Sequence, residues 1–114
     1  MINGAHAILY SADAEATRAA LREVLGTRSV DAGGGWLIFA LPPAEIAVHP
    51  AGEGGRTELY LMCDDVEATL AVLRAKGIEA TTPVSDQGWG LLTAISLPGG
   101  VELGLYQPRH PTAF

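Results

Sequence analysis

The chain has 114 residues, of which 48% are hydrophobic and 18% charged, enough for one compact domain with an apolar core. Its net charge of −6, with seven Lys and Arg residues that do not cluster, argues against nucleic-acid binding, which needs a basic surface. The low charged fraction indicates that some apolar surface is buried against another chain.

Two further features bear on where the protein works. No apolar run approaches the roughly 18 residues of a membrane span. The first four residues lack the charged and apolar regions of a signal peptide. We therefore expect a cytoplasmic protein with no membrane partner.

The single cysteine, Cys63, excludes an internal disulfide and a thiolate metal cluster. Its strand-like setting predicts an unreactive, buried thiol.

An internal repeat organises the chain. When the sequence is shifted by 52 residues, residues 5–22 fall on residues 57–74. Both copies have the pattern of an apolar strand that leads directly into a helix. The identical pairs are Asp13/Asp65, Glu15/Glu67, Ala16/Ala68, Thr17/Thr69, Ala19/Ala71, Leu21/Leu73 and Arg22/Arg74. A period near half the chain predicts two similar modules, residues 4–50 and 56–108, within a single domain of residues 1–114.

The first module is predicted to begin with a strand over residues 5–10 and a helix over residues 11–25. Gly26 ends this helix in the position where a left-handed cap favours glycine. Three strands follow, at residues 28–31, 36–41 and 45–49, with a glycine turn and a Pro-Pro turn between them. The polar, glycine-rich residues 50–56 link the modules.

The second module is predicted to repeat this order. A strand covers residues 57–62, and Asp64 with Glu67 has the spacing of a capping box at the start of the next helix. Val66, Leu70 and Leu73 give that helix an apolar stripe. Strands are expected at residues 78–81, 89–97 and 101–106, a loop at 83–88, a hairpin turn at 98–100, and an extended surface tail at 107–114.

Paired modules of strand, helix and three strands resemble the vicinal oxygen chelate superfamily, which includes glyoxalase I, extradiol dioxygenases, fosfomycin-resistance enzymes and bleomycin-resistance proteins. The resemblance rests on His6 in the first strand, on helices that begin at aspartate, and on the turn and last strand over residues 97–106. It implies an α+β fold of two βαβββ modules around a cup-shaped cleft, the glyoxalase/bleomycin resistance/dihydroxybiphenyl dioxygenase fold. The cleft would bind a small molecule, often over one divalent metal.

In metal-dependent members each module supplies two ligands, one from its first strand and one from its last. The corresponding residues here are His6, Ala47, Glu58 and Gly104. His6 and Glu58 can bind zinc, nickel, iron or manganese, whereas Ala47 and Gly104 cannot. His49 and Glu102 lie two residues from the empty positions, a displacement of about 6.6 Å along a strand. We therefore expect a two-ligand or shifted metal site, or none, rather than four ligands.

Strand alternation predicts the cleft independently, because residues two apart share a face. If the leucines at positions 59, 61, 103 and 105 pack under the helices, the opposite face is unusually polar. The candidates on that face are His6, Tyr10, Glu45, His49, Glu58, Tyr60, Met62, Glu102 and Tyr106. Trp89, beside two glycines, is a candidate wall for a flat ligand. By their local context, Glu45 after a turn and His110 in the tail are expected to be solvated.

Two classes of function follow. In an enzyme, His6 and Glu58 would hold a metal that polarises a substrate oxygen, and Glu102 or His49 would move a proton. In a metal-free binding protein that resembles the bleomycin-resistance group, tyrosines, Trp89 and carboxylates would sequester an aromatic or cationic compound. The resemblance also implies a two-fold homodimer, the commonest small assembly.

Overall fold

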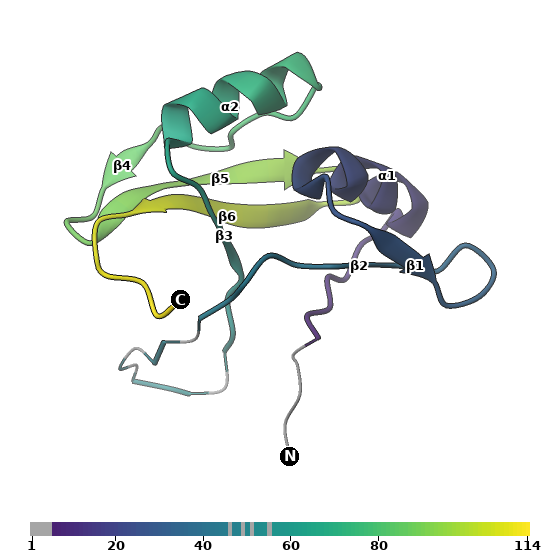
Figure 1. Ribbon diagram of the computed structural model, residues 1–114, viewed down its shortest axis with the longest axis horizontal. Coiled ribbons are helices and arrows are strands. Elements are labelled where there is room, and N and C mark those ends of the chain that lie inside the picture. The colour runs from purple at the N-terminus through teal and green to yellow at the C-terminus, as the bar shows by residue number, and fades with distance from the viewer. Residues whose placement is uncertain (1–5, 46, 49, 51, 55) are drawn as a thin grey trace.

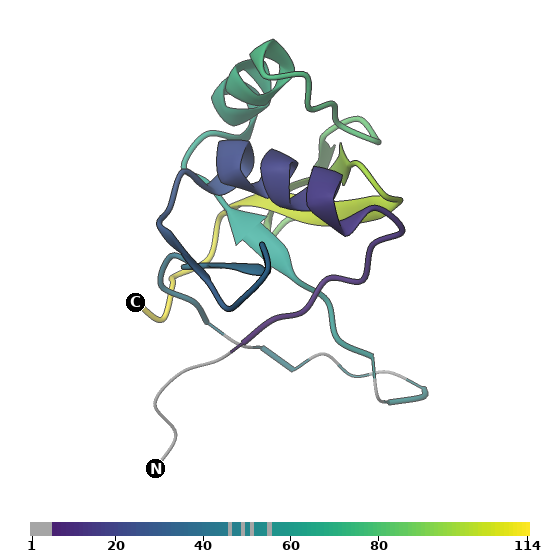
Figure 2. The same cartoon turned by 90° about the vertical axis from the view of Figure 1, so that its right-hand side faces the viewer.

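The computed structural model describes residues 6–45, 47–48, 50, 52–54 and 56–114. Its elements are α1 (Ala14–Leu25), β1 (Ser29–Asp31), β2 (Leu37–Phe39), β3 (Tyr60–Met62), α2 (Val66–Ala75), β4 (Ser85–Asp86), β5 (Gly90–Leu97) and β6 (Val101–Pro108). This is a mixed α+β fold with one four-stranded and one two-stranded sheet. Both helices lie on the same side of the four-stranded sheet (Figures 1 and 2).

The four-stranded sheet has the strand order β3-β6-β5-β4. Its centre is the long antiparallel hairpin predicted from the sequence, in which β5 and β6 pair over their full lengths around the turn at residues 98–100. β6 runs two residues beyond its predicted end, to Pro108. β3 pairs with β6 in parallel, with Tyr60 beside Gly104 and Met62 beside Tyr106. The chain crosses between these strands through α2, which therefore covers one face of the sheet.

The hydrophobic core lies between α2 and this sheet. The predicted stripe of α2 is confirmed, because Val66, Leu70 and Leu73 are all buried. Among the described residues, the buried apolar core is Val66, Leu70, Leu73, Ile78, Ile95, Leu97, Val101, Leu103 and Leu105. Burying one such side chain contributes about 1.5–3 kcal/mol. Because Leu103 and Leu105 face α2, Glu102, Gly104 and Tyr106 occupy the opposite face, as alternation predicted.

The helices begin one residue after an aspartate that caps them. Asp13 accepts a hydrogen bond from Ala16 N at 3.1 Å, and Asp65 accepts one from Ala68 N at 3.0 Å. The capping box predicted at Asp64 is therefore wrong, because only the residue that directly precedes the helix can reach these free N–H groups. α1 likewise begins at Ala14 rather than at residue 11. Its predicted end is confirmed, with Gly26 at φ 60°.

The first half of the chain differs from its prediction. β1 and β2 pair antiparallel, but the described residues of the strands predicted at 5–10 and 45–49 are not in strands. A strand requires backbone hydrogen bonds to a neighbour, and the described strands pair with one another and not with these segments. Pro42, Pro43 and Pro50, which flank the segment, also have no N–H to donate. α1 packs against β5 rather than covering a sheet of its own.

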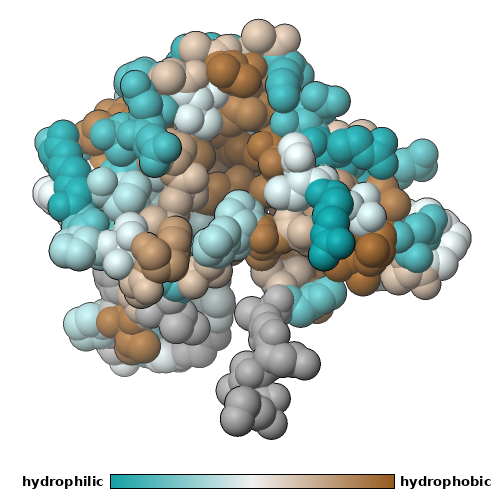
Figure 3. Space-filling view, in the orientation of Figure 1, coloured by the Kyte–Doolittle hydropathy of each residue, from teal (hydrophilic) through white to brown (hydrophobic). Residues whose placement is uncertain are grey.

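Smaller differences occur in the second half. Of the strand predicted at residues 78–81, Ala80 forms a single bridge with Ile95. β4 lies in the segment predicted to be a loop. Between the helices, apolar side chains line a hollow on the face shown in Figure 3, and Lys76 Nζ spans the helices to donate to Glu23 O at 3.1 Å. In the described part of the chain, neither helix is long and apolar enough to cross a membrane.

Candidate functional site

A cavity of about 750 Å³ lies where residues 6–9 and 57–60 approach β5 and β6. It brings together four of the residues predicted for the cleft, namely His6, Glu58, Tyr60 and Glu102. No lysine or arginine is among the described residues that line it. Glu58 and Glu102 are the carboxylates among these lining residues, and Arg56, outside the lining, lies 3.2 Å from Glu58 and offsets part of its charge.

Glu58 and Tyr60 form a polar pair at the cavity wall. The Tyr60 hydroxyl donates to Glu58 Oε2 at 2.6 Å, and Arg56 Nη2 lies 3.2 Å from the other carboxylate oxygen. The hydrogen bond to Glu58, followed by burial, raises the pKa of Tyr60 above 10.0. The ion pair with Arg56 is exposed and therefore weak. Glu58 is thus held in place while it remains open to solvent.

Gly104, one of the four positions that correspond to metal ligands in the family, is covered by the ring of Tyr60. A Cβ atom at Gly104 would clash with that ring, because the parallel register places the two residues side by side. Only glycine, which has no Cβ atom, leaves room for the Tyr60 ring at this position. The aromatic side chain occupies the space where a ligand from β6 would project.

Glu102 lies on the same face of β6, two residues from Gly104. Its Oε1 accepts a hydrogen bond from Thr81 Oγ1 at 2.5 Å. The side chain is exposed, so its charge remains available to a bound molecule. Glu58 and Glu102 together supply the acidic groups of the cavity.

An aromatic cluster extends from the cavity wall along the sheet. The rings of Tyr60 and Tyr106 meet edge to face with centroids 5.8 Å apart, and Trp89 packs on Tyr106 in the same manner at 5.5 Å. Such pairs add about 0.5–1.5 kcal/mol each beyond the area that they bury. Burial, and then the neighbouring Glu45, raises the pKa of Tyr106 above 10.0. Tyr106 and Trp89 thus lie outside the cavity lining, and Tyr106 packs between Trp89 and Tyr60.

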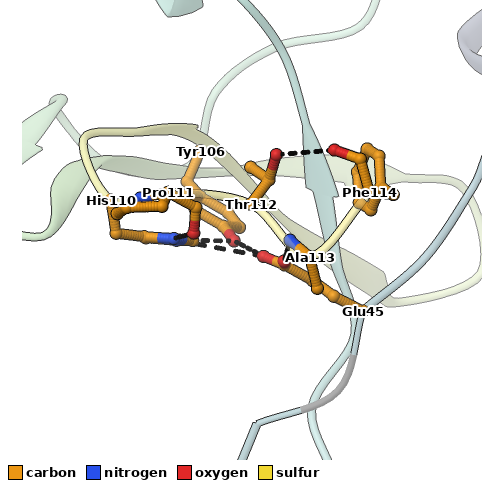
Figure 4. A network of polar contacts seen from close by, with 7 residues as sticks. All are labelled: Glu45, Tyr106, His110, Pro111, Thr112, Ala113 and Phe114. Carbon is orange, nitrogen blue, oxygen red and sulfur yellow. Dashed lines mark hydrogen bonds and ion pairs between the residues drawn. The ribbon is translucent and has the colours of Figure 1, made fainter.

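From the sequence, Glu45 and His110 were both expected to be solvated. In the structure both side chains are only partly exposed. The Glu45 side chain is 19% exposed and that of His110 is 34% exposed. They converge with Tyr106 and the C-terminal residues in one polar network (Figure 4). Neither neighbouring sequence nor local periodicity signals this, because the contact joins residues more than 60 positions apart.

Other predicted site residues lie apart from the cavity. Tyr10 is 88% exposed and Met62, in register with Tyr106, is half-buried, and neither lines the cavity. His49 falls outside the described residues. Lining residues that sequence reasoning missed come from β4, β5 and the segment before them: Thr82, Ser85, Leu92 and Ala94. Alternation along residues 89–97, applied as it was to β6, indicates Leu92 and Ala94.

The residues present do not fit the four-ligand metal site of the family. Ala47 has no donor atom, and the Tyr60 ring covers Gly104. Across residues 6–45, 47–48, 50, 52–54 and 56–114, no group of three or more His, Cys, Asp and Glu side chains could hold a metal ion. The thiol of Cys63 is half-buried, and burial raises its pKa, in keeping with the unreactive thiol expected.

Comparison with known proteins agrees with this architecture. The family model of the Glyoxalase/Bleomycin resistance protein/Dioxygenase superfamily matches residues 4–105, and the chain belongs to this superfamily. No curated protein sequence matches the chain.

Several solved structures have the same fold. One is TnmS3, an antibiotic binding protein from Streptomyces sp. CB03234, with 26% identity over 91% of this chain and 99% of that one and a TM-score of 0.59. A glyoxalase/bleomycin resistance protein/dioxygenase from Nocardioides has 20% identity over 91% and 82% of the two chains, with a TM-score of 0.59. TioX from Micromonospora sp. ML1 has 20% identity over 92% and 99%, with a TM-score of 0.54.

Proposed function

We propose that this protein binds a small, flat, cationic organic molecule in the cavity between residues 6–9, residues 57–60 and the β5–β6 hairpin. The observation that carries the proposal is that the cavity combines two carboxylates, Glu58 and Glu102, with the aromatic ring of Tyr60, and that Glu102 has no lysine or arginine partner among the described residues. The similarity to TnmS3, an antibiotic binding protein, supports a binding role.

The physical basis is complementarity of charge and shape. A cation above an aromatic face gains about 0.5–2 kcal/mol. A carboxylate partner at a partly exposed site adds roughly 0.2–1 kcal/mol, and this part is screened by salt. The apolar lining residues Leu92 and Ala94 supply surface for the flat body of the ligand. Sequestration of such a compound needs no chemical step.

Fluorescence titration with two dyes of opposite charge tests this proposal. We expect ethidium, a flat aromatic cation, to bind and fluorescein, a flat anion, not to bind. Glu102→Gln should weaken ethidium binding by about 3- to 10-fold, the equivalent of roughly 1 kcal/mol. Glu53→Gln, in the exposed linker, is the matched control and should change nothing. Equal affinity for both dyes, or no effect of Glu102→Gln, would contradict the proposal.

A second candidate is a metal-assisted enzyme with two protein ligands, supported by the fact that His6 and Glu58 line one cavity. His6 and Glu58 would hold the metal, which would supply a Lewis acid, and Glu102 would move a proton, with His49 as the other candidate for this role. Elemental analysis of protein purified without chelator separates the candidates. Stoichiometric Zn, Ni, Fe or Mn that is lost in His6→Ala and retained in His110→Ala supports the enzyme. A cytoplasmic location, expected from the sequence, suits either.

A further inference from the structure

The C-terminal residues turn back beneath the four-stranded sheet, on the side opposite α2 (Figure 1). This is the face that carries Tyr60, Gly104 and Tyr106. The ring of His110 lies against Tyr106, with centroids 6.1 Å apart and planes tilted by 31°. Residues 109–114 therefore cover the end of the cleft face at which the aromatic cluster lies.

The base of this segment is fixed to the second half of the chain. Arg109 N donates to Trp89 O at 2.8 Å, and its guanidinium lies 2.7 Å from Asp86 Oδ2. The backbone N–H of Gly88, and then Arg109, lowers the pKa of the Asp86 carboxyl. These contacts continue the pairing of β5 with β6, so the base remains attached whenever that hairpin is folded.

Among the described residues of the first half, Glu45 makes the polar side-chain contacts with the far end of the segment. Glu45 Oε2 accepts a hydrogen bond from Ala113 N at 2.8 Å, and Oε1 accepts one from the Tyr106 hydroxyl at 3.5 Å (Figure 4). His110 Nε2 lies 3.9 Å from the same carboxylate. Hydrogen bonds to a carboxylate are about twice as strong as neutral ones. Removal of this one group would free the far end and leave the base intact.

We propose that residues 109–114 form a strap over the Tyr106 end of the cleft and that Glu45 is its latch. The latch joins the two halves of the chain. Its functional group is a carboxylate, the same group that Glu58 and Glu102 contribute to the cavity. For the ligand, the inference rests on the proposed function: a cationic group that reaches Glu45 competes with Ala113 N–H and the Tyr106 hydroxyl. Release of the strap uncovers Tyr106, the ring that packs against the Tyr60 wall.

The strap is tested first without any ligand, by hydrogen exchange at single amides. Glu45→Ala should speed exchange at the Ala113 amide by about tenfold or more, since a charge-assisted hydrogen bond is lost, and should leave exchange at the Arg109 amide in the base unchanged. Glu53→Ala should change neither. A chain that ends at Pro108 lacks the strap altogether. An unchanged Ala113 exchange rate in Glu45→Ala overturns the latch.

Binding kinetics then test the effect on access. Stopped-flow mixing with ethidium should show a faster association rate for Glu45→Ala and for the chain that ends at Pro108 than for the Glu53→Ala control. Unchanged association rates in both would overturn the role of the strap in access. If ethidium fails to bind any variant, the proposed function fails, while amide exchange still decides whether Glu45 holds the strap.

Discussion

At the scale of single residues, Tyr60 and Tyr106 show how the surroundings in the cleft shift the pKa of a side chain. Both have a pKa above the ordinary value of 10.0, but the main causes differ. For Tyr60 the largest cause is the hydrogen bond to Glu58, and for Tyr106 it is burial. In each case the neutral hydroxyl is the form that the folded protein favours, through the hydrogen bond to Glu58 for Tyr60 and through burial for Tyr106.

These shifts predict a loss of stability at alkaline pH. A folded-state pKa above the unfolded value means that the folded chain holds the proton more tightly. The resulting stability is complete below pH 10.0 and is lost as the pH rises through the folded-state values. Tyrosinate absorbance and chemical unfolding, followed across this range, measure both effects. Glu58→Gln should lower the pKa of Tyr60 and leave that of Tyr106 unchanged, and a Tyr60 titration that does not respond would refute this assignment.

At the scale of elements, the two helices occupy equivalent places in the repeat but have different contacts. Ala12 N donates to Gly99 O at 3.0 Å, so the tip of the β5–β6 hairpin meets the start of α1. Gly99 has φ 85°, and a Cβ atom there would meet Ser11, Asp13 and Thr17. The hairpin tip therefore requires glycine for its backbone conformation and for its close approach to α1.

Thr17 in α1 and Thr69 in α2 occupy equivalent positions in the repeat. A comparison of the two shows what contact with the hairpin tip contributes. Each hydroxyl lies within hydrogen-bond distance of the backbone O of its own N-cap residue, Asp13 or Asp65. The buried Thr17 hydroxyl also contacts Pro98 O and Ser11 Oγ, both at 2.6 Å. Thr17→Val would remove the hydrogen bond to the part-buried Pro98 O and should cost about 0.5–1.5 kcal/mol of unfolding free energy. Thr69→Val should cost less than about 0.5 kcal/mol. Urea denaturation of both variants tests this, and equal losses would show that the contact with the hairpin contributes nothing.

At the scale of the whole molecule, the two halves are unequal in burial. All buried apolar core residues in the described chain come from positions 66–105. The exposed large apolar side chains of the first half are Ile8, Tyr10, Val30, Trp36, Leu41 and Val48. We propose that a second copy of the chain covers this surface, in keeping with the homodimer that the sequence led us to expect.

A charge placed on this surface should separate the copies. Val48, 94% exposed, lies in the first half, and Val72, 57% exposed, lies on α2. We expect sedimentation at micromolar concentration to give the mass of two chains for the wild type and for Val72→Asp. Val48→Asp should shift the mass toward one chain. A wild-type protein that sediments as a single chain would exclude the dimer.

Much of the second half could be predicted from the sequence because its signals are local. Helical spacing located α2, and alternation along residues 57–62 and 101–106 correctly placed Glu102, Gly104 and Tyr106 opposite the buried leucines. Side-chain direction along a helix or strand depends only on backbone period, so a few consecutive residues define it. Four of the residues that the sequence predicted for the cleft, His6, Glu58, Tyr60 and Glu102, line one cavity, although His6 and Glu58 do not lie in strands.

The tertiary structure alone decided which segments pair and which side chains meet across the chain. The repeat gave the first half the pattern of strands at 5–10 and 45–49, yet their described residues have no partner strand. The local sequence of Glu45 predicts a solvated residue after a turn. The side chain is instead half-buried, because residues of the C-terminal strap pack against it. Pairing between distant segments depends on the relative free energies of competing contacts, and no short stretch of sequence contains that comparison.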